Sequence, residues 1–336
     1  MRVLVTGVAG FIGSNVVRSL LKREKDVVVV GVDNMDPYYD VSLKEERLRC
    51  LHHDERFLFL KGDVADKDFM DEVFRSHRPE YVLHFAAKVG VRHSVSHPEE
   101  YIATNINGFF NILEACRKFP VSHLVYASSS SVYGANATVP YSTEDNVDSP
   151  VSLYAATKKS NELMAHAYSQ LYALPSTGLR FFTVYGPAGR PDMAYFSFTD
   201  KLVKGENIQL YNYGDCLRDF TYIDDITEGV LRVMRRPPVQ DGEARPPYAL
   251  YNIGNSHPEN LTDFVRILSE ELVLADVLPE DFNLNAYVEL LPMQSGDVPV
   301  TYADVRPLEE DFGFKPSTQL RDGLRRFAQW YAETYK

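Results

Sequence analysis

The chain has 336 residues, and its 35 lysines and arginines against 47 aspartates and glutamates give a formal net charge of −12. This balance disfavours a protein that binds duplex nucleic acid, because such binding needs a clustered basic surface. Apolar residues make up 45% of the chain and charged residues 24%, a globular mixture that excludes wholesale disorder. The length is sufficient for about two domains.

Neither a membrane span nor a secretory signal is expected. Apolar runs are all shorter than the roughly 18 residues of a spanning helix, and the first residues lack the apolar run of a signal peptide. The three cysteines, Cys50, Cys116 and Cys216, do not have the spacing of a zinc or redox site. His52 and His53 lie in a charged segment without a partner at ligand spacing. We therefore expect reduced thiols, no metal and a cytoplasmic location.

Short apolar runs alternate with segments of helical spacing through the first half of the chain. The expected strands are Val3 to Val5, Val27 to Val32, Phe57 to Leu60, Tyr81 to Phe85 and His123 to Ala127. The expected helices are Phe11 to Leu21, Lys44 to Arg56, Phe69 to Phe74 and Tyr101 to Lys118. Continuous apolar strands between helices predict an α/β fold, a doubly wound parallel sheet that is covered on both faces.

The pattern becomes irregular from about Thr177, which indicates a second, smaller α/β region. The proline-rich segment Arg236 to Pro247 is predicted to be an exposed loop. Leu320, Leu324, Phe327 and Tyr331 share one helical face, so Leu320 to Thr334 is predicted to be an amphipathic helix.

Three glycines, Gly7, Gly10 and Gly13, follow the first strand directly and open a helix. A tight turn without Cβ atoms allows the backbone to approach a pyrophosphate, and the helix N-terminus offers N–H groups to it. The bland alternative is that these glycines only pack a helix on a sheet. Their position between strand and helix favours a dinucleotide site.

An acidic residue ends the second strand, and another follows the third. Asp33 stands 20 residues after Gly13, where a carboxylate accepts hydrogen bonds from the ribose hydroxyls and repels a 2′-phosphate. This position favours NAD over NADP. Asp63 and Val64 follow the third strand and would flank the adenine.

Tyr154 and Lys158 are four residues apart, which places them on one face of a helix. A tyrosine has a pKa of about 10, and a nearby ammonium group would lower it toward the range of a useful base. Taken alone, this pair is more often a solvated helix face. The serine run from Ser128 to Ser131 directly follows the strand that ends at Ala127, where doubly wound sheets bind ligands.

In this order, the motifs resemble the extended short-chain dehydrogenase/reductase family, in its nucleotide-sugar branch, over essentially the whole chain. They are Gly7-x-x-Gly10-x-x-Gly13, Asp33, Asp63, Phe85-Ala86-Ala87, Asn105, the serine run, Tyr154-x-x-x-Lys158 and Arg218-Asp219-Phe220-x-x-Ile223-Asp224-Asp225. The resemblance implies an NAD-binding Rossmann domain, residues 1–178 with roughly 220–250, and a nucleotide-sugar lobe, residues 179–219 and 251–336. It also implies a homodimer formed through the helices at Tyr101–Lys118 and Leu153–Leu171.

The resemblance assigns roles by position. Ser129, Tyr154 and Lys158 would be catalytic. Besides Tyr154 and Lys158, the NAD-binding residues would be Gly7, Gly10, Phe11, Ile12, Gly13, Asp33, Asn34, Asp63, Val64, Phe85, Ala86, Ala87 and Asn105. The substrate-binding residues would be Ser129, Ser130, Thr183, Arg190, Arg218, Asp297 and, with less support, Arg92. One departure is Gln294, where the galactose epimerases of the branch carry an arginine.

Two further positions separate the reactions of this branch. The 4,6-dehydratases carry an acidic pair, and the glucuronate decarboxylases a glutamate, where this chain has Ser130 and Ser131. The string Arg190-Pro191-Asp192-Met193-Ala194 resembles the UDP-glucuronate 4-epimerases, in which Arg190 would meet the sugar carboxylate. The alternative for Arg190 is an ion pair within the protein. This resemblance implies 4-epimerisation of UDP-glucuronate and a role in polysaccharide biosynthesis.

Other functions remain open at this point. The chain could decarboxylate UDP-glucuronate or epimerise another UDP-hexose. A non-catalytic NAD-binding regulatory protein on the same fold is a third interpretation. That interpretation does not explain why Ser129, Tyr154 and Lys158 occur together.

Overall fold

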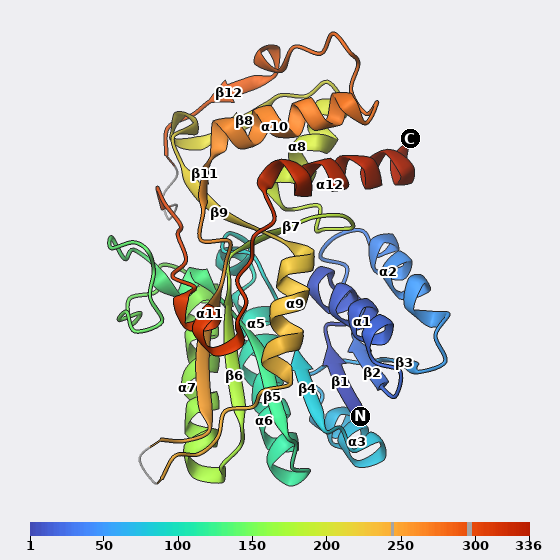
Figure 1. Ribbon diagram of the computed structural model, residues 1–336, viewed down its shortest axis with the longest axis vertical. Coiled ribbons are helices and arrows are strands. Elements are labelled where there is room, and N and C mark those ends of the chain that lie inside the picture. The colour runs from blue at the N-terminus through green and yellow to red at the C-terminus, as the bar shows by residue number, and fades with distance from the viewer. Residues whose placement is uncertain (243–244, 294–297) are drawn as a thin grey trace.

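The computed structural model describes residues 1–242, 245–293 and 298–336, which form a larger lobe below a smaller one (Figure 1). A parallel sheet of seven strands forms the larger lobe, in the order β10–β6–β5–β4–β1–β2–β3. Its strands are β1 (Arg2–Thr6), β2 (Val28–Asp33), β3 (Phe57–Lys61), β4 (Tyr81–His84), β5 (His123–Ser129), β6 (Ser176–Phe181) and β10 (Tyr248–Ile253). The chain order reverses between β1 and β4, and doubly wound sheets bind ligands at such a point.

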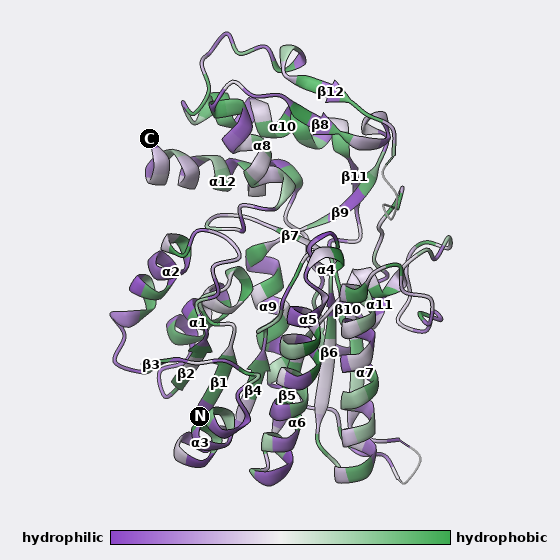
Figure 2. Ribbon diagram, turned by 180° about the vertical axis from the view of Figure 1, so that it is seen from behind, coloured by the Kyte–Doolittle hydropathy of each residue, from purple (hydrophilic) through white to green (hydrophobic). Residues whose placement is uncertain are grey.

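Helices cover both faces of this sheet, as the apolar strands require (Figure 1). On one face lie α1 (Phe11–Arg23), α2 (Ser42–His52), α9 (Ile223–Met234) and α11 (Arg306–Phe312). On the other lie α3 (Lys67–His77), α6 (Phe109–Lys118) and α7 (Leu153–Tyr172). Val3 and Val5 of β1 belong to one buried apolar cluster and Leu4 to another, and Figure 2 shows the apolar character of β1, β4 and β5. The predicted fold class is confirmed.

In the part of the chain that the structure describes, the smaller lobe combines short strands with three α-helices and two short 3₁₀ helices. It contains the sheet β11–β9–β7 and the pair β12–β8, formed by β7 (Thr183–Tyr185), β8 (Ile208–Leu210), β9 (Leu217–Tyr222), β11 (Pro258–Asn260) and β12 (Val288–Leu290). Its helices are α8 (Ala194–Val203), α10 (Leu261–Leu274) and α12 (Leu320–Tyr335). The predicted apolar face of α12 is buried, with Leu324 and Phe327 fully enclosed. Among the described residues, no helix is long and apolar enough to cross a membrane.

The segment from Tyr101 to Lys118 is not one regular helix. After the short helices α4 (His93–Ser96) and α5 (Pro98–Tyr101), residues Ile102–Gly108 form a π-helix, and α6 begins only at Phe109. The wider turn coincides with close packing, because a Cβ on Gly108 would lie 2.7 Å from Cγ2 of Val64. The predicted helix is therefore present, but its first part is π-helical rather than α-helical.

A buried ion pair fastens α7 to the sheet. Glu162 of α7 accepts hydrogen bonds from Nε and Nη2 of Arg180 on β6, both at 2.8 Å. The two side chains are 3% and 1% exposed. Glu162 also accepts a 2.6 Å hydrogen bond from Oγ of Ser128 at the end of β5. The pair therefore joins one helix to two adjacent strands.

Replacing Glu162 with Gln should strongly destabilise the protein, because Arg180 would keep a buried charge without its partner. Breaking a buried pair in this way costs about 3–5 kcal/mol. Urea unfolding of the variant measures this loss. Glu309→Gln is the matched control, because Glu309 and Lys315 form an exposed pair at 3.5 Å and such pairs contribute at most about 1 kcal/mol. Equal losses in the two variants would contradict the assigned role of Glu162.

Candidate active site

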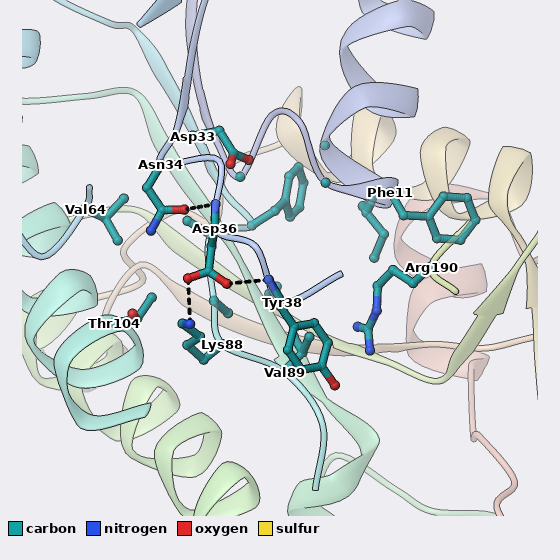
Figure 3. A pocket seen from close by; sticks show the side chains of 18 of the residues that line it. Phe11, Asp33, Asn34, Asp36, Tyr38, Val64, Lys88, Val89, Thr104 and Arg190 are labelled. Carbon is teal, nitrogen blue, oxygen red and sulfur yellow. Dashed lines mark hydrogen bonds and ion pairs between the residues drawn. The ribbon is translucent and has the colours of Figure 1, made fainter. Parts of the chain in front are cut away.

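A pocket opens where strands β1, β2, β4 and β5 end (Figure 3). It lies at the carboxyl edge of the sheet, beside the reversal of strand order. Most of the predicted NAD-binding residues line it, together with Ser129, Tyr154, Lys158 and Arg190: Gly7, Gly10, Phe11, Ile12, Gly13, Asp33, Asn34, Asp63, Val64, Phe85, Ala86 and Ala87. Residues from distant parts of the sequence thus meet at one site.

The glycine turn brings the backbone unusually close to β4 and α1. Gly7 has φ of +71°, and a Cβ at this position would lie 2.6 Å from the backbone nitrogen of Ala86. A Cβ on Gly13 would lie 2.3 Å from the carbonyl oxygen of Gly7. Gly10 caps α1 without any side-chain hydrogen bond. The first turn of α1 therefore presents backbone N–H groups to the pocket, which suits a pyrophosphate.

Asp33 at the end of β2 is held in place by several contacts. Its Oδ2 accepts a hydrogen bond from the backbone of Ala9 at 3.0 Å, and Oδ1 lies 3.3 Å from Nζ of Lys44. Beside it, the Asn34 amide donates to the Asp63 carboxylate at 2.8 Å. The carboxylate that sequence analysis assigned to the ribose thus also supports the glycine turn. Lys44 was not anticipated, because nothing in its helix pattern pointed inward.

Tyr154, Lys158 and Ser129 converge where α7 begins and β5 ends. The side chain of Ser152 caps α7 by accepting from the backbone of Ala155, and Tyr154 stands in the first turn. Nζ of Lys158 donates to the carbonyl of Ala127 at 3.0 Å, and burial lowers the pKa of Lys158 to about 8. Helical spacing thus places both side chains beside the serine run, as predicted.

The electrostatics of Tyr154 differ from the simple expectation that Lys158 lowers its pKa. Burial raises the pKa of Tyr154, while a hydrogen bond with Ser129 and the charge of Arg190 oppose that increase. Lys158 instead directs its ammonium group to the carbonyl of Ala127. In this structure, desolvation therefore outweighs the neighbouring cations.

Asn105 lies behind the pocket wall. Its side-chain oxygen accepts from the backbone N–H of Lys88 at 2.8 Å, and its nitrogen donates to the carbonyl of Lys88 at 3.0 Å. The same nitrogen donates to Oγ1 of Thr157 at 3.1 Å. Asn105 thereby fixes the segment after β4 against α7. Its predicted direct contact with the cofactor stays a prediction.

Arg190 lines the pocket but already has an intramolecular partner. Its Nε and Nη2 donate to the two carboxylate oxygens of Asp192, at 3.0 and 2.5 Å. Arg47 holds the preceding segment by donating to the carbonyls of Ala188 and Gly189. The ion-pair alternative for Arg190 and its place in the pocket are thus both observed. The role of Arg47 at this segment was missed, because the two carbonyls that it binds there lie about 140 residues away in the sequence.

The remaining substrate-binding candidates lie outside the lining of this pocket, as far as the described ranges show. Ser130 begins a short 3₁₀ turn after β5, and Thr183 begins β7. Arg218 of β9 donates to the carbonyls of Leu217 and Pro299, while the guanidinium of Arg92 lies 5.5 Å from the ring centroid of Tyr211. The positions of Asp297 and Gln294 are outside the described residues. These assignments stay predictions.

One group of possible metal ligands was not anticipated. His93, His97 and Glu100 bring their ligand atoms within 4.8 Å of one another. The two imidazole rings are stacked, and Glu100 already pairs with Lys88 at 2.6 Å. Lys88 bonds to Asp36 as well, at 2.7 Å (Figure 3). The carboxylate of Glu100 is thus already paired with Lys88, which lines the pocket.

Lys158 should make stability depend on pH above neutrality. Its pKa is about 8 in the folded protein and 10.5 when exposed, so only the unfolded chain holds the extra proton between these values. The free energy of unfolding therefore rises with pH across this window, by about 3 kcal/mol in total. Urea titrations at pH 7.5 and 10.5 should show this rise in the nucleotide-free wild type relative to Lys158→Met. Parallel pH dependences in the two proteins would contradict it.

Comparisons with known proteins agree with this geometry. Residues 3–254 match the family model "NAD dependent epimerase/dehydratase family". Protein CapI of Staphylococcus aureus is 48% identical, with 100% of both chains covered, and UDP-glucuronate 4-epimerase 4 of Arabidopsis thaliana is 44% identical over 99% of this chain and 76% of that one. The crystal structure of UDP-glucuronic acid 4-epimerase from Bacillus cereus, in complex with UDP-glucuronic acid and NAD, superposes with a TM-score of 0.88 at 30% identity, covering both chains completely. The chain belongs to the NAD-dependent epimerase/dehydratase family.

Proposed function

We propose that this protein is a UDP-glucuronate 4-epimerase, which interconverts UDP-glucuronate and UDP-galacturonate through a transient 4-keto sugar. The observation that carries the proposal is the presence of Arg190 in the same pocket as Ser129, Tyr154 and Lys158. A guanidinium beside a tyrosine base suits a sugar that bears a carboxylate near its reacting carbon. The Arabidopsis relative and the Bacillus cereus structure, both named for this reaction, support the assignment.

The two lobes divide the binding of ligands in this proposal. Residues 1–178 with roughly 220–250 hold NAD, and residues 179–219 with 251–336 hold the nucleotide sugar, although the end of β10 and α11 in the last range pack with the large sheet. The pyrophosphate of NAD would lie on the N-terminus of α1, beside a turn in which a side chain on Gly7 or Gly13 would clash with the protein backbone. Asp33 would receive the ribose hydroxyls, and Asp63 with Val64 would flank the adenine. These residues fit NAD because the tight glycine turn leaves the N-terminus of α1 open and Asp33 is hydrogen-bonded to the backbone of that turn.

The residues around the sugar supply acid–base chemistry. Tyr154 as phenolate removes the proton of the 4-hydroxyl, and Ser129, whose hydroxyl opposes the increase that burial causes in the pKa of Tyr154, assists this transfer. Lys158 lies one helical turn after the tyrosine and donates to the carbonyl of Ala127, while the charge of Arg190 opposes the increase that burial causes in the pKa of Tyr154. Bound NAD supplies the acceptor and later the donor of a hydride at C4. Return of the hydride to the opposite face of the keto sugar inverts the carbon.

The carboxylate makes the reaction more demanding than epimerisation of a neutral hexose. A 4-keto sugar with a carboxylate on C5 is a β-keto acid, which loses carbon dioxide when the breaking bond stands perpendicular to the carbonyl plane. Arg190, with Thr183 and the serine run, would hold the carboxylate away from that orientation. Ser130 and Ser131 also offer no carboxylic acid to protonate C5. Both features favour epimerisation over decarboxylation.

We propose that the protein works as a homodimer in the cytoplasm, and that its product serves polysaccharide biosynthesis. Large apolar side chains are exposed on neighbouring helices α6 and α7, including Phe110 (44%), Leu163 (60%) and Leu171 (69%). Such a surface suits contact with a second copy of the chain. The exposed free thiol of Cys50 suits a reducing compartment.

Incubation of the purified protein with UDP-glucuronate should yield UDP-galacturonate without added cofactor, and denaturation should release NAD. Tyr154→Phe should lower kcat by at least about 100-fold, because general base catalysis contributes that much. NMR of the product mixture identifies the sugar nucleotide that is formed and compares its rate of formation between the wild type and Tyr154→Phe. A UDP-pentose product would instead indicate decarboxylation, and unchanged activity of Tyr154→Phe would contradict the catalytic role.

Arg190→Ala should weaken turnover of UDP-glucuronate, because the sugar carboxylate would lose its charge-assisted hydrogen bonds. Each such bond contributes about 1.5–3 kcal/mol, so kcat/KM should fall by roughly tenfold or more. Steady-state kinetics measure the change. Wild-type values of both KM and kcat would show that the carboxylate binds elsewhere, with Arg92 as the next candidate.

A further inference from the structure

The partner of Arg190 is itself a carboxylate. Within the described residues, Asp192 accepts from Nε and Nη2 of Arg190, in the bidentate arrangement that best fixes a guanidinium. Both side chains are only partly exposed, 22% for Arg190 and 29% for Asp192. The pair therefore stands at the pocket wall, and its geometry bears on how Arg190 can meet a ligand.

Asp192 has a second contact, which reaches across to the other lobe. The hydroxyl of Tyr38 donates to Oδ2 of Asp192 at 3.3 Å. Tyr38 comes from the segment after β2, and Figure 3 shows its ring beside Arg190. This segment is fixed in turn, because Asp36 bonds to Lys88 at 2.7 Å and the ring of Tyr38 packs edge-on against His93. Asp192 is thus held from both sides.

The geometry leaves part of the arginine for a ligand. A guanidinium carries five N–H donors, and Asp192 takes one on Nε and one on Nη2. Nη1 and the second hydrogen of Nη2 form another edge, which can donate two parallel hydrogen bonds to a second carboxylate. Asp192 therefore does not occupy the whole fork. It restricts the rotation of a long side chain that would otherwise sample many rotamers.

We propose that Asp192, supported by Tyr38, is a positioning residue that aims the free edge of Arg190 at the sugar carboxylate and so makes the pocket select a uronate. This inference rests on the proposed function. A positioning role differs from a rival role, in which the negative charge of Asp192 would repel the substrate carboxylate. It also differs from a purely structural role, which would affect all UDP-sugars alike.

The test compares two ligands that differ at C5. UDP-xylose has the pyranose of UDP-glucuronate with a hydrogen in place of the carboxylate, so the ratio of their dissociation constants isolates the carboxylate contact. Calorimetry on the NAD-loaded enzyme measures both constants for wild type, Asp192→Asn and Tyr38→Phe. Asp192→Asn keeps the shape of the side chain and removes its charge. Thermal unfolding and retained NAD verify that each variant is folded.

In Asp192→Asn the dissociation constant of UDP-glucuronate should rise about tenfold, which is the effect of losing one charge-assisted hydrogen bond. The dissociation constant of UDP-xylose should stay unchanged. In Tyr38→Phe the dissociation constant of UDP-glucuronate should rise about threefold, because a neutral hydrogen-bond donor is lost. Equal weakening of both ligands would overturn the proposal in favour of a structural role. Tighter binding of UDP-glucuronate by Asp192→Asn would overturn it in favour of a rival.

The outcome also separates this inference from the proposed function. A wild type that makes UDP-galacturonate and prefers UDP-glucuronate, together with an Asp192→Asn variant of unchanged preference, would reject only the role of Asp192. A wild type that makes no UDP-galacturonate and binds both ligands equally would reject the proposed function, and the inference with it.

Discussion

The inner face of α7 meets the end of β5 through two polar contacts, and the positions of the candidate reacting groups depend on them. Lys158 donates to the carbonyl of Ala127, and one helical turn further on Glu162 accepts from Ser128. The two contacts engage consecutive strand residues because helical spacing brings every fourth side chain to the same face. Ser129 follows directly in β5, so the two contacts that fix the helix also place this serine beside Tyr154.

Charge in the pocket is arranged in local pairs rather than as one basic field. Lys44 lies against Asp33, and Arg190 against Asp192, so neither cation stands alone before a ligand enters. Lys158 differs, because its partner is a neutral carbonyl and burial depresses its pKa. The net charge of −12 is thus compatible with anionic ligands, since helix N-termini and individually positioned cations act at short range.

The sequence predicted the large sheet well because its signals are local. Strands buried on both faces appear as continuous apolar runs, and Gly7 and Gly13 mark a turn where a Cβ has no space. The π-helix at Ile102–Gly108 was not predictable, because the contacts that accompany it, packing of Gly108 against Val64 and hydrogen bonds between Asn105 and Lys88, join distant parts of the chain. Helical periodicity records none of these long-range contacts.

The candidate site shows the same division. Tyr154 and Lys158 were found because the two residues lie four positions apart on one helix. Glu162 lies on the same face of this helix but was missed, because its structural role depends on a buried ion pair with Arg180 of β6, which lies outside the helix pattern.

The choice between epimerisation and decarboxylation depends on two separate features of such a site. One is the presence of an acid that can protonate C5, which residue identity at positions 130 and 131 reveals directly. The other is the direction in which the carboxylate is held, which in the proposed function follows the orientation of Arg190 and hence its contacts with Asp192 and Tyr38. A serine at position 131 therefore removes the means of decarboxylation only in part. The loss of carbon dioxide needs an aligned bond, and an acid then protonates C5 to complete the decarboxylation, so the proposed control of the guanidinium would be the second half of the selectivity.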